Sequence, residues 1–62
     1  MPDLTPRERD VLSLAAQGKP NKLICRELDI GMGTVKSHLL PAYRKLGVHN
    51  RTQAALAWHR LN

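Results

Sequence analysis

The chain has 62 residues, a net charge of +5 and a single cysteine, Cys25. This length allows one domain with a small core, and one cysteine excludes an internal disulfide. No apolar run is long enough to cross a membrane, and "MPDLTPRERD" lacks the apolar stretch of a signal peptide, so we expect one cytoplasmic domain over residues 1–62 and no membrane partner.

The charges are distributed unevenly along the chain. All five acidic residues precede Gly31, where an equal number of basic residues balances them. The second half has no acid and supplies the whole net charge through Lys36, Arg44, Lys45, Arg51 and Arg60. A basic half without acids favours a polyanionic partner such as nucleic acid. From charge alone, a solvated cationic surface is an equal alternative.

The segment "LTPRERDVLSLAAQG" carries three helix start signals close together. Thr5 is a suitable N-cap, Pro6 fits the first helical position, and Glu8 completes a capping box. The apolar stripe that follows consists of Val11, Leu12, Ala15 and Ala16. Gly18 then suits a left-handed stop, so the segment predicts one helix with a buried inner stripe.

Two further helices are predicted on either side of the segment "DIGMG". Asn21 is a suitable cap for a short helix over about 22–29. A longer helix over about 32–46 follows, and Gly47 should end it, with Val48 packing back as in a Schellman ending. A short helix, a tight turn with glycine and a second helix form the helix-turn-helix arrangement.

The longer helix has an inner and an outer face. Its apolar residues recur at helical spacing, at Val35, Leu39, Ala42 and Leu46. The residues turned outward are then Gly33, Lys36, Ser37, Leu40, Pro41 and Arg44. This mixed face suits the major groove of DNA, where Lys36 can donate to guanine, Ser37 can bond several base edges, and Leu40 can contact a thymine methyl.

Phosphate contacts are expected around these base contacts, because they position a protein on the duplex. The candidates are Thr34, His38 and Lys45 beside the outer face, Arg44 on it, and Asn21 and Lys22 at the start of the short helix.

Pro41 lies within the longer helix, where it lacks a backbone N–H and its ring meets the carbonyl of Ser37. In a helix interior this costs ~3 kcal/mol. Because Pro41 is on the outer face, its ring need not disturb the core. We expect a kink over about 37–41 with the helix resuming afterwards, since the apolar spacing keeps its register across the proline.

A fourth helix is predicted from Asn50 to the C-terminus, with Gln53 placed to return the capping hydrogen bond. Its apolar residues cover more than one face, which leaves Leu56 or Trp58 to contact a second subunit. Together, these elements predict an all-α, four-helix bundle-like domain that contains a helix-turn-helix.

Five motifs follow one another along the chain, namely "LTPRERDVL", "GKPNKLI", "TVKSH", "RKLGV" and "NRTQA". In this order and spacing they resemble the DNA-binding domain of the LuxR/FixJ/NarL family of bacterial transcription regulators, over nearly the whole chain. The resemblance implies that the third helix enters the major groove of double-stranded DNA and that the fourth mediates homodimerisation. RNA polymerase is a further candidate partner.

The resemblance also implies roles for individual residues. Base contacts would come from Lys36, Ser37 and Leu40, and backbone contacts from around Asn21, Lys22, Thr34, His38 and Arg51. Members of the family usually carry an N-terminal receiver or ligand-binding domain. We therefore expect this chain to be either an excised C-terminal domain or a short stand-alone member.

Three positions depart from the pattern of the family. Leu40 stands where a polar or charged residue is usual, and Pro41 where a helix former is usual. Gly31 occupies the position at which Ser or Thr normally caps the third helix. We therefore expect one hydrogen-bonding base contact to be lost and the start of the helix to be looser, because glycine is a weaker cap.

Catalytic and metal-binding arrangements are missing from the sequence. Neither Cys25 nor the three histidines have metal-ligand spacing, so we expect no metal and no cofactor, with Cys25 as a small buried hydrophobe. Ser37 and His38 are adjacent on a helix and cannot face each other as nucleophile and base. We therefore expect no enzymatic activity.

The main prediction is a sequence-specific DNA-binding transcription regulator that acts as a dimer. A sigma-factor-like promoter-reading module is one alternative, and it would bind DNA while held by RNA polymerase. A basic protein-interaction domain without specific DNA readout is the other. Affinity that falls steeply with salt and depends on base sequence would distinguish the first function from the last.

Overall fold

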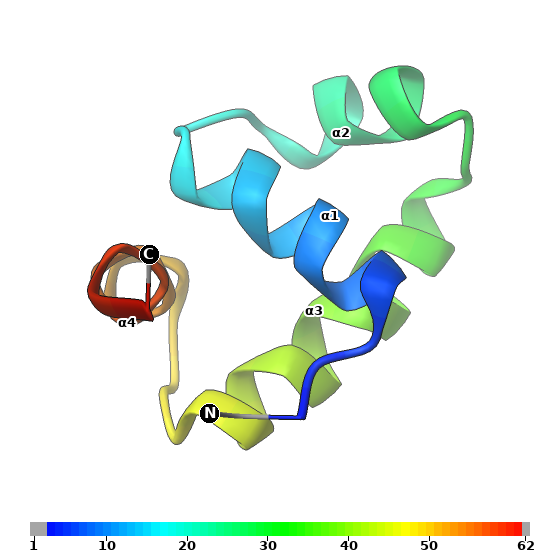
Figure 1. Ribbon diagram of the computed structural model, residues 1–62. Helices are drawn as coiled ribbons and strands as arrows, with labels where there is room; N and C mark the ends of the chain where they lie inside the picture. The colour runs from blue at the N-terminus through cyan, green and yellow to red at the C-terminus, as the bar shows by residue number, and fades with distance from the viewer. Residues whose placement is uncertain (1–2, 62) are drawn as a thin grey trace.

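The computed structural model describes residues 3–61, which form four α-helices with the first at the centre (Figure 1). The helices are α1 (Pro6–Ala16), α2 (Asn21–Leu28), α3 (Met32–Leu46) and α4 (Arg51–Leu61). α1 contacts all three others, while α2 and α3 pack against each other as the helix-turn-helix. All regular structure within residues 3–61 is helical, which confirms the predicted fold class.

The start of α1 is closed by the predicted capping box. The Oγ1 of Thr5 accepts the backbone N–H of Glu8 at 3.1 Å, and the Oε1 of Glu8 accepts the backbone N–H of Thr5 at 2.9 Å. Pro6 occupies the first helical position, and Gly18 has a φ of 87° beyond the other end. The local start and stop signals therefore act as predicted.

Two apolar clusters form the core. The cluster between α1, α2 and α3 consists of Val11, Ala15, Ile24, Val35 and Leu39. The cluster between α1, α3 and α4 consists of Leu4, Leu12, Ala42 and Ala54. Cys25 is half-buried and packs against the first cluster as a small hydrophobe. Because α3 contributes to both clusters, packing along its length fixes which face it turns to solvent.

The start of α2 differs from the prediction. Its N-cap is Pro20 rather than Asn21, and no side chain caps it. Asn21 is the first helical residue, and its side chain bonds Arg51 instead. The helix ends at Leu28, and its C-cap Asp29 has a left-handed φ of 55°, a conformation that aspartate tolerates better than most residues. Gly31 then begins α3 as a cap without a side-chain hydrogen bond.

α3 continues through Pro41 as one helix from Met32 to Leu46. The proline therefore does not break it, in agreement with the expectation, and the kink stays a prediction. α3 ends at Gly47, with a φ of 71°, and the backbone N–H of Val48 donates to the carbonyl of Tyr43 at 3.0 Å. This bond is the predicted Schellman ending.

Asn50 caps the start of α4 as predicted, but Gln53 bonds a different residue from the one predicted. Asn50 Oδ1 accepts the backbone N–H of Gln53 at 2.9 Å. The Gln53 side chain returns a bond at 2.8 Å to the N–H of His49, one residue before the cap, rather than to Asn50. The predicted end of this helix at the C-terminal residue 62 lies outside the described residues. Within residues 3–61, no helix has the length and apolar character to cross a membrane.

Candidate nucleic-acid interface

The outer face of α3 is open where base contacts were predicted. Lys36 and Ser37 are exposed, and Leu40 exposes 58% of its surface. The side chains of Lys36 and Arg44 form no hydrogen bond or ion pair within the described range 3–61. Both cations therefore face solvent, where they can interact with a polyanion.

Ser37 has its hydroxyl proton engaged inside the helix. Its Oγ donates to the backbone carbonyl of Thr34 at 2.8 Å. A hydroxyl has one proton and two lone pairs, so an incoming base finds an acceptor here. Ser37 is therefore suited to the amino groups of adenine or cytosine, a direction of hydrogen bonding that the sequence left open.

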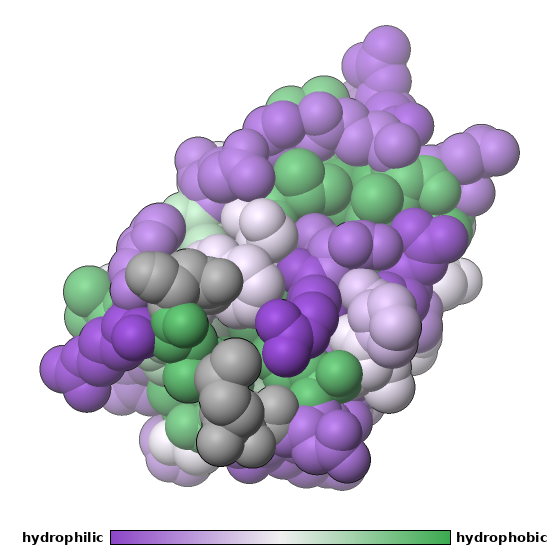
Figure 2. All heavy atoms as spheres, viewed as in Figure 1, coloured by the Kyte–Doolittle hydropathy of each residue, from purple (hydrophilic) through white to green (hydrophobic). Residues whose placement is uncertain are grey.

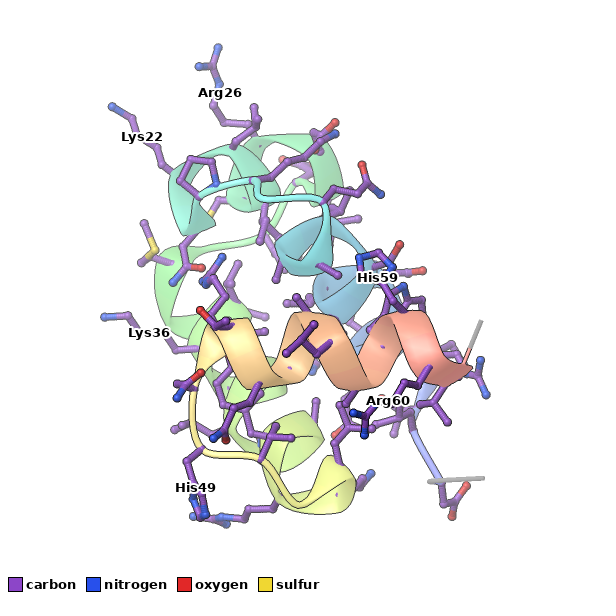
Figure 3. The ribbon with its side chains drawn as sticks, turned by 90° about the vertical axis from the view of Figure 1, so that its left-hand side faces the viewer. Lys22, Arg26, Lys36, His49, His59 and Arg60 are labelled. Carbon is purple, nitrogen blue, oxygen red and sulfur yellow. The ribbon has the colours of Figure 1, made fainter. Side chains whose placement is uncertain are left out.

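Cations from both helices of the helix-turn-helix lie on one side of the molecule. Figure 3 shows Lys22 of α2 and Lys36 of α3 extending to this side, while Arg60 lies on α4. Lys22 and Thr34 are exposed and His38 is half-buried, so these predicted phosphate contacts lie at or near the surface. In the part of the chain that the structure describes, no three His, Cys, Asp or Glu side chains gather as a metal site.

Arg51 and Asn21, two predicted phosphate contacts, are paired with each other. The Nη2 of Arg51 donates to the Oδ1 of Asn21, and its Nη1 donates to the backbone carbonyl of Lys19 at 2.9 Å. These bonds join the first turn of α4 to the start of α2. No local pattern in the sequence indicates this pair, because the two residues are 30 positions apart. Their phosphate contacts stay predictions, and the bond between the two side chains would compete with those contacts.

Lys45 also has an internal partner. Its Nζ lies 2.7 Å from the Oε1 of Glu8, whose side chain is only 7% exposed. The Lys45 ammonium, followed by the Thr5 N–H, lowers the pKa of Glu8 below its ordinary 4.5. The sequence predicted Glu8 only as a cap, and the structure makes it a counter-ion as well. Of the two cations that end α3, Lys45 is paired with Glu8 and Arg44 is not, and the phosphate contacts of both stay predictions.

The two predicted dimer contacts of α4 lie in different environments. Leu56 is 60% exposed, whereas Trp58 is half-buried and packs against the second core cluster. Leu56 also lines shallow grooves on both sides of the helix, which include Ala16 and Ala55 on one side and Val48 and Ala57 on the other. Its role in a dimer stays a prediction, and Leu56 is the better placed of the pair.

Apolar groups reach the surface in patches separated by hydrophilic side chains (Figure 2). Over the described residues, the exposed large hydrophobic side chains are Leu23, Met32, Leu40 and Leu56. Scattered exposed hydrophobics are normal in soluble proteins. Leu40 and Leu56 differ from the others because each lies at a position for which the sequence predicts an intermolecular contact.

The family model "Bacterial regulatory proteins, luxR family" matches residues 2–58. The chain belongs to this family. A solved structure, "Structure of Transcription factor, GerE", has a TM-score of 0.82 and 40% sequence identity, covering 94% of this chain and 87% of that one. The family and the fold confirm the resemblance expected from the five sequence motifs.

Curated relatives agree with this membership. The nitrate/nitrite response regulator protein NarL of Escherichia coli (strain K12) is 52% identical over 56 residues, which are 90% of this chain and 26% of NarL. The spore germination protein GerE of Bacillus subtilis (strain 168) is 47% identical over 55 residues, or 89% of this chain and 74% of GerE. The chain thus spans about a quarter of the length of NarL and most of GerE.

These findings identify a LuxR-type helix-turn-helix DNA-binding domain of a transcription regulator, as predicted. The family is a class of DNA-binding regulators rather than a class of enzymes. Two of the three positions expected to depart from the family pattern lie side by side in α3. Pro41 is accommodated in a continuous α3, and Leu40 stands on its exposed face.

Proposed function

We propose that the domain places the outer face of α3 in the major groove and that two copies, paired through α4, bind a two-fold DNA site. One observation carries the first part: α3 packs into both core clusters with one face and exposes Lys36, Ser37 and Leu40 on the other. A helix held in this way presents a fixed set of side chains to base edges.

The two polar side chains of this face, Lys36 and Ser37, suit different groups in the groove. Lys36 donates to O6 and N7 of guanine, and Ser37 accepts from an amino group because its proton is bonded to Thr34. Arg44 and Lys22 then neutralise phosphates at the margins of the contact. The net charge of +5 supports this arrangement, since it attracts the duplex before any base is contacted.

Pairing through α4 is supported by the position of Leu56. An apolar side chain that is 60% exposed between two shallow grooves can fill a groove on a second copy, while its own groove accepts the partner's side chain. This reciprocal arrangement is what a two-fold interface requires. Half-sites would then lie on one face of the duplex, about one turn (10–10.5 bp) or a multiple of it apart.

Selection from a pool of random duplexes tests this function. Wild type should enrich an inverted repeat, and Lys36→Ala should lose that enrichment while retaining weaker, salt-sensitive binding. Arg9→Ala is the matched control, because it removes an exposed cation of α1 that belongs neither to the outer face of α3 nor to the grooves beside Leu56, and it should enrich the same sequence as wild type. Failure of wild type to enrich any sequence above backbone-level binding would contradict the proposal.

A further inference from the structure

Leu40 is the centre of an apolar facet on the outer face of α3. It exposes 58% of its surface, and its neighbour Pro41 is half-buried beside it. Lys36 and Arg44, both exposed, lie one turn before and one turn after Leu40, about 6 Å away along the axis in each direction. The facet is therefore bracketed by two cations on the face that the proposed function assigns to DNA.

The facet cannot form a hydrogen bond with a base. Leucine has no polar atom in its side chain, and Pro41 has no backbone N–H. Placed against a carbonyl, ring nitrogen or amino group of a base, the facet would displace water without replacing its hydrogen bond. The C5-methyl of a pyrimidine is the apolar group on the major-groove edge, so it is the group that the facet matches.

Ser37 is compatible with a base that carries this methyl. It lies three residues before Leu40, a separation at which side chains are neighbours on a helix. Because its proton is bonded to the Thr34 carbonyl, it presents an acceptor to the groove. A base pair that carries a C5-methyl presents an amino group in the groove, as every base pair does, so the acceptor of Ser37 fits it and the selection for the methyl rests on Leu40. Ser37 and Leu40 together match this pair of groups.

We propose that Leu40 determines specificity for a base that carries a C5-methyl, with Pro41 completing the apolar surface behind it. Thymine and 5-methylcytosine carry this methyl at the same ring position, so both satisfy the facet. Methylation of a cytosine at this position therefore strengthens binding. The inference rests on the proposed function, because it requires the outer face of α3 to lie in the major groove.

The test begins with a duplex selected by the wild-type domain. Each thymine is replaced in turn by deoxyuridine, which removes only the methyl, and each cytosine in turn by 5-methylcytosine. At the position that Leu40 contacts, deoxyuridine should weaken binding about four-fold, the factor that corresponds to ~0.8 kcal/mol for one buried methyl group. A cytosine placed there should bind about four-fold more tightly once methylated.

Three variants assign the effect to Leu40. Two affinity ratios are compared, thymine over deoxyuridine and 5-methylcytosine over cytosine, at the position that Leu40 contacts. Leu40→Ala should reduce both ratios to near one, and Leu40→Met should retain them because it keeps an apolar contact. Lys22→Ala, which removes an exposed cation proposed to contact phosphate, should weaken every duplex and leave the ratios unchanged. Far-ultraviolet circular dichroism checks that the Leu40 variants stay folded, which is expected since the side chain is exposed.

The outcomes separate the two hypotheses. Ratios that are the same in wild type and Leu40→Ala, or that are near one at every position, overturn the role of Leu40 while sequence-specific binding stands. An effect for thymine alone supports the contact of Leu40 with the thymine methyl and overturns the strengthening of binding by cytosine methylation. If no duplex is bound specifically, the proposed function fails and the role of Leu40 fails with it.

Discussion

The ammonium of Lys45 lies 2.7 Å from the same Glu8 oxygen that accepts the backbone N–H of Thr5. One buried carboxylate oxygen thus closes the start of α1 and holds the last turn of α3. A hydrogen bond to a charged group stabilises a fold more than a neutral one does, and removing one partner leaves the other without compensation. This link between the first and third helices can be tested directly.

Replacing Lys45 by Met should lower the free energy of unfolding by about 1–2 kcal/mol, because the Glu8 carboxylate loses its counter-ion. Arg44→Met is the matched control, since Arg44 is exposed on the same turn and should change stability by less than about 0.5 kcal/mol. Urea titration followed by circular dichroism measures both. Equal stability of Lys45→Met and wild type would show that the bond contributes nothing in solution.

The same link predicts a loss of stability in acid. The pKa of Glu8 is lowered below 4.5 in the fold, so its contribution is fully present above that pH and is lost as the pH falls through the folded value. Glu8→Gln removes the titrating group. The difference in urea midpoint between wild type and Glu8→Gln should be largest near neutral pH and should shrink as the pH falls below 4.5. A difference that stays constant over this range would show that stability does not depend on the ionisation of Glu8.

Pro41→Ala should make the domain more stable. Proline is about 3 kcal/mol less favourable than alanine inside a helix, and α3 runs through position 41 without a break. Part of this gain is offset because proline also restricts the unfolded chain, so we expect an increase of about 1–2 kcal/mol. Thermal unfolding measures it. A lower midpoint would mean that α3 depends on the proline for its shape.

Arg51→Lys should destabilise the domain although it keeps the charge. A lysine cannot reproduce the two bonds that the guanidinium makes to the Lys19 carbonyl and to Asn21, and we expect a loss of about 1–2 kcal/mol. Asn21→Ala removes one of these bonds. A double-mutant cycle should give a coupling of at least about 0.5 kcal/mol between Arg51 and Asn21. Additive effects would show that the pair does not act as a unit.

Leu56→Asp should leave the isolated domain folded and impair its pairing. The side chain is 60% exposed, so stability should change by less than about 0.5 kcal/mol. On a duplex with two half-sites, the complex with two bound copies should be lost or strongly reduced, and the complex with one copy should remain. Leu56→Met is the conservative control. Unchanged two-copy binding by Leu56→Asp would place the dimer contact elsewhere.

The sequence predicted those features that depend on neighbouring residues. The Thr5–Glu8 capping box and the ending at Gly47 and Val48 are local arrangements, and the structure has both. The inner stripe of α3 was predicted from periodicity, and Val35, Leu39 and Ala42 are buried. The same periodicity predicts the outer face of α3, because a helix with one buried face turns the other to solvent.

The features that the sequence did not reveal are contacts between distant positions. Glu8 and Lys45 are 37 residues apart, and Asn21 and Arg51 are 30 apart. The capping error has the same origin, because Asn21 has the right side chain for an N-cap and uses it to bind α4. A side chain suited to a local role can be drawn to a distant partner by the fold, and no local pattern reports this.

The bonds from Arg51 to Lys19 and Asn21 have a geometric consequence for the DNA site. They link the first turn of α4, the helix proposed for pairing, to the start of α2 in the helix-turn-helix of the same copy. In a pair formed through α4, the separation of the two α3 helices would then depend on the α4 contact and on the position of α4 within each copy. The domain itself would therefore set the number of base pairs between half-sites, and the signal that brings two copies together would not change it.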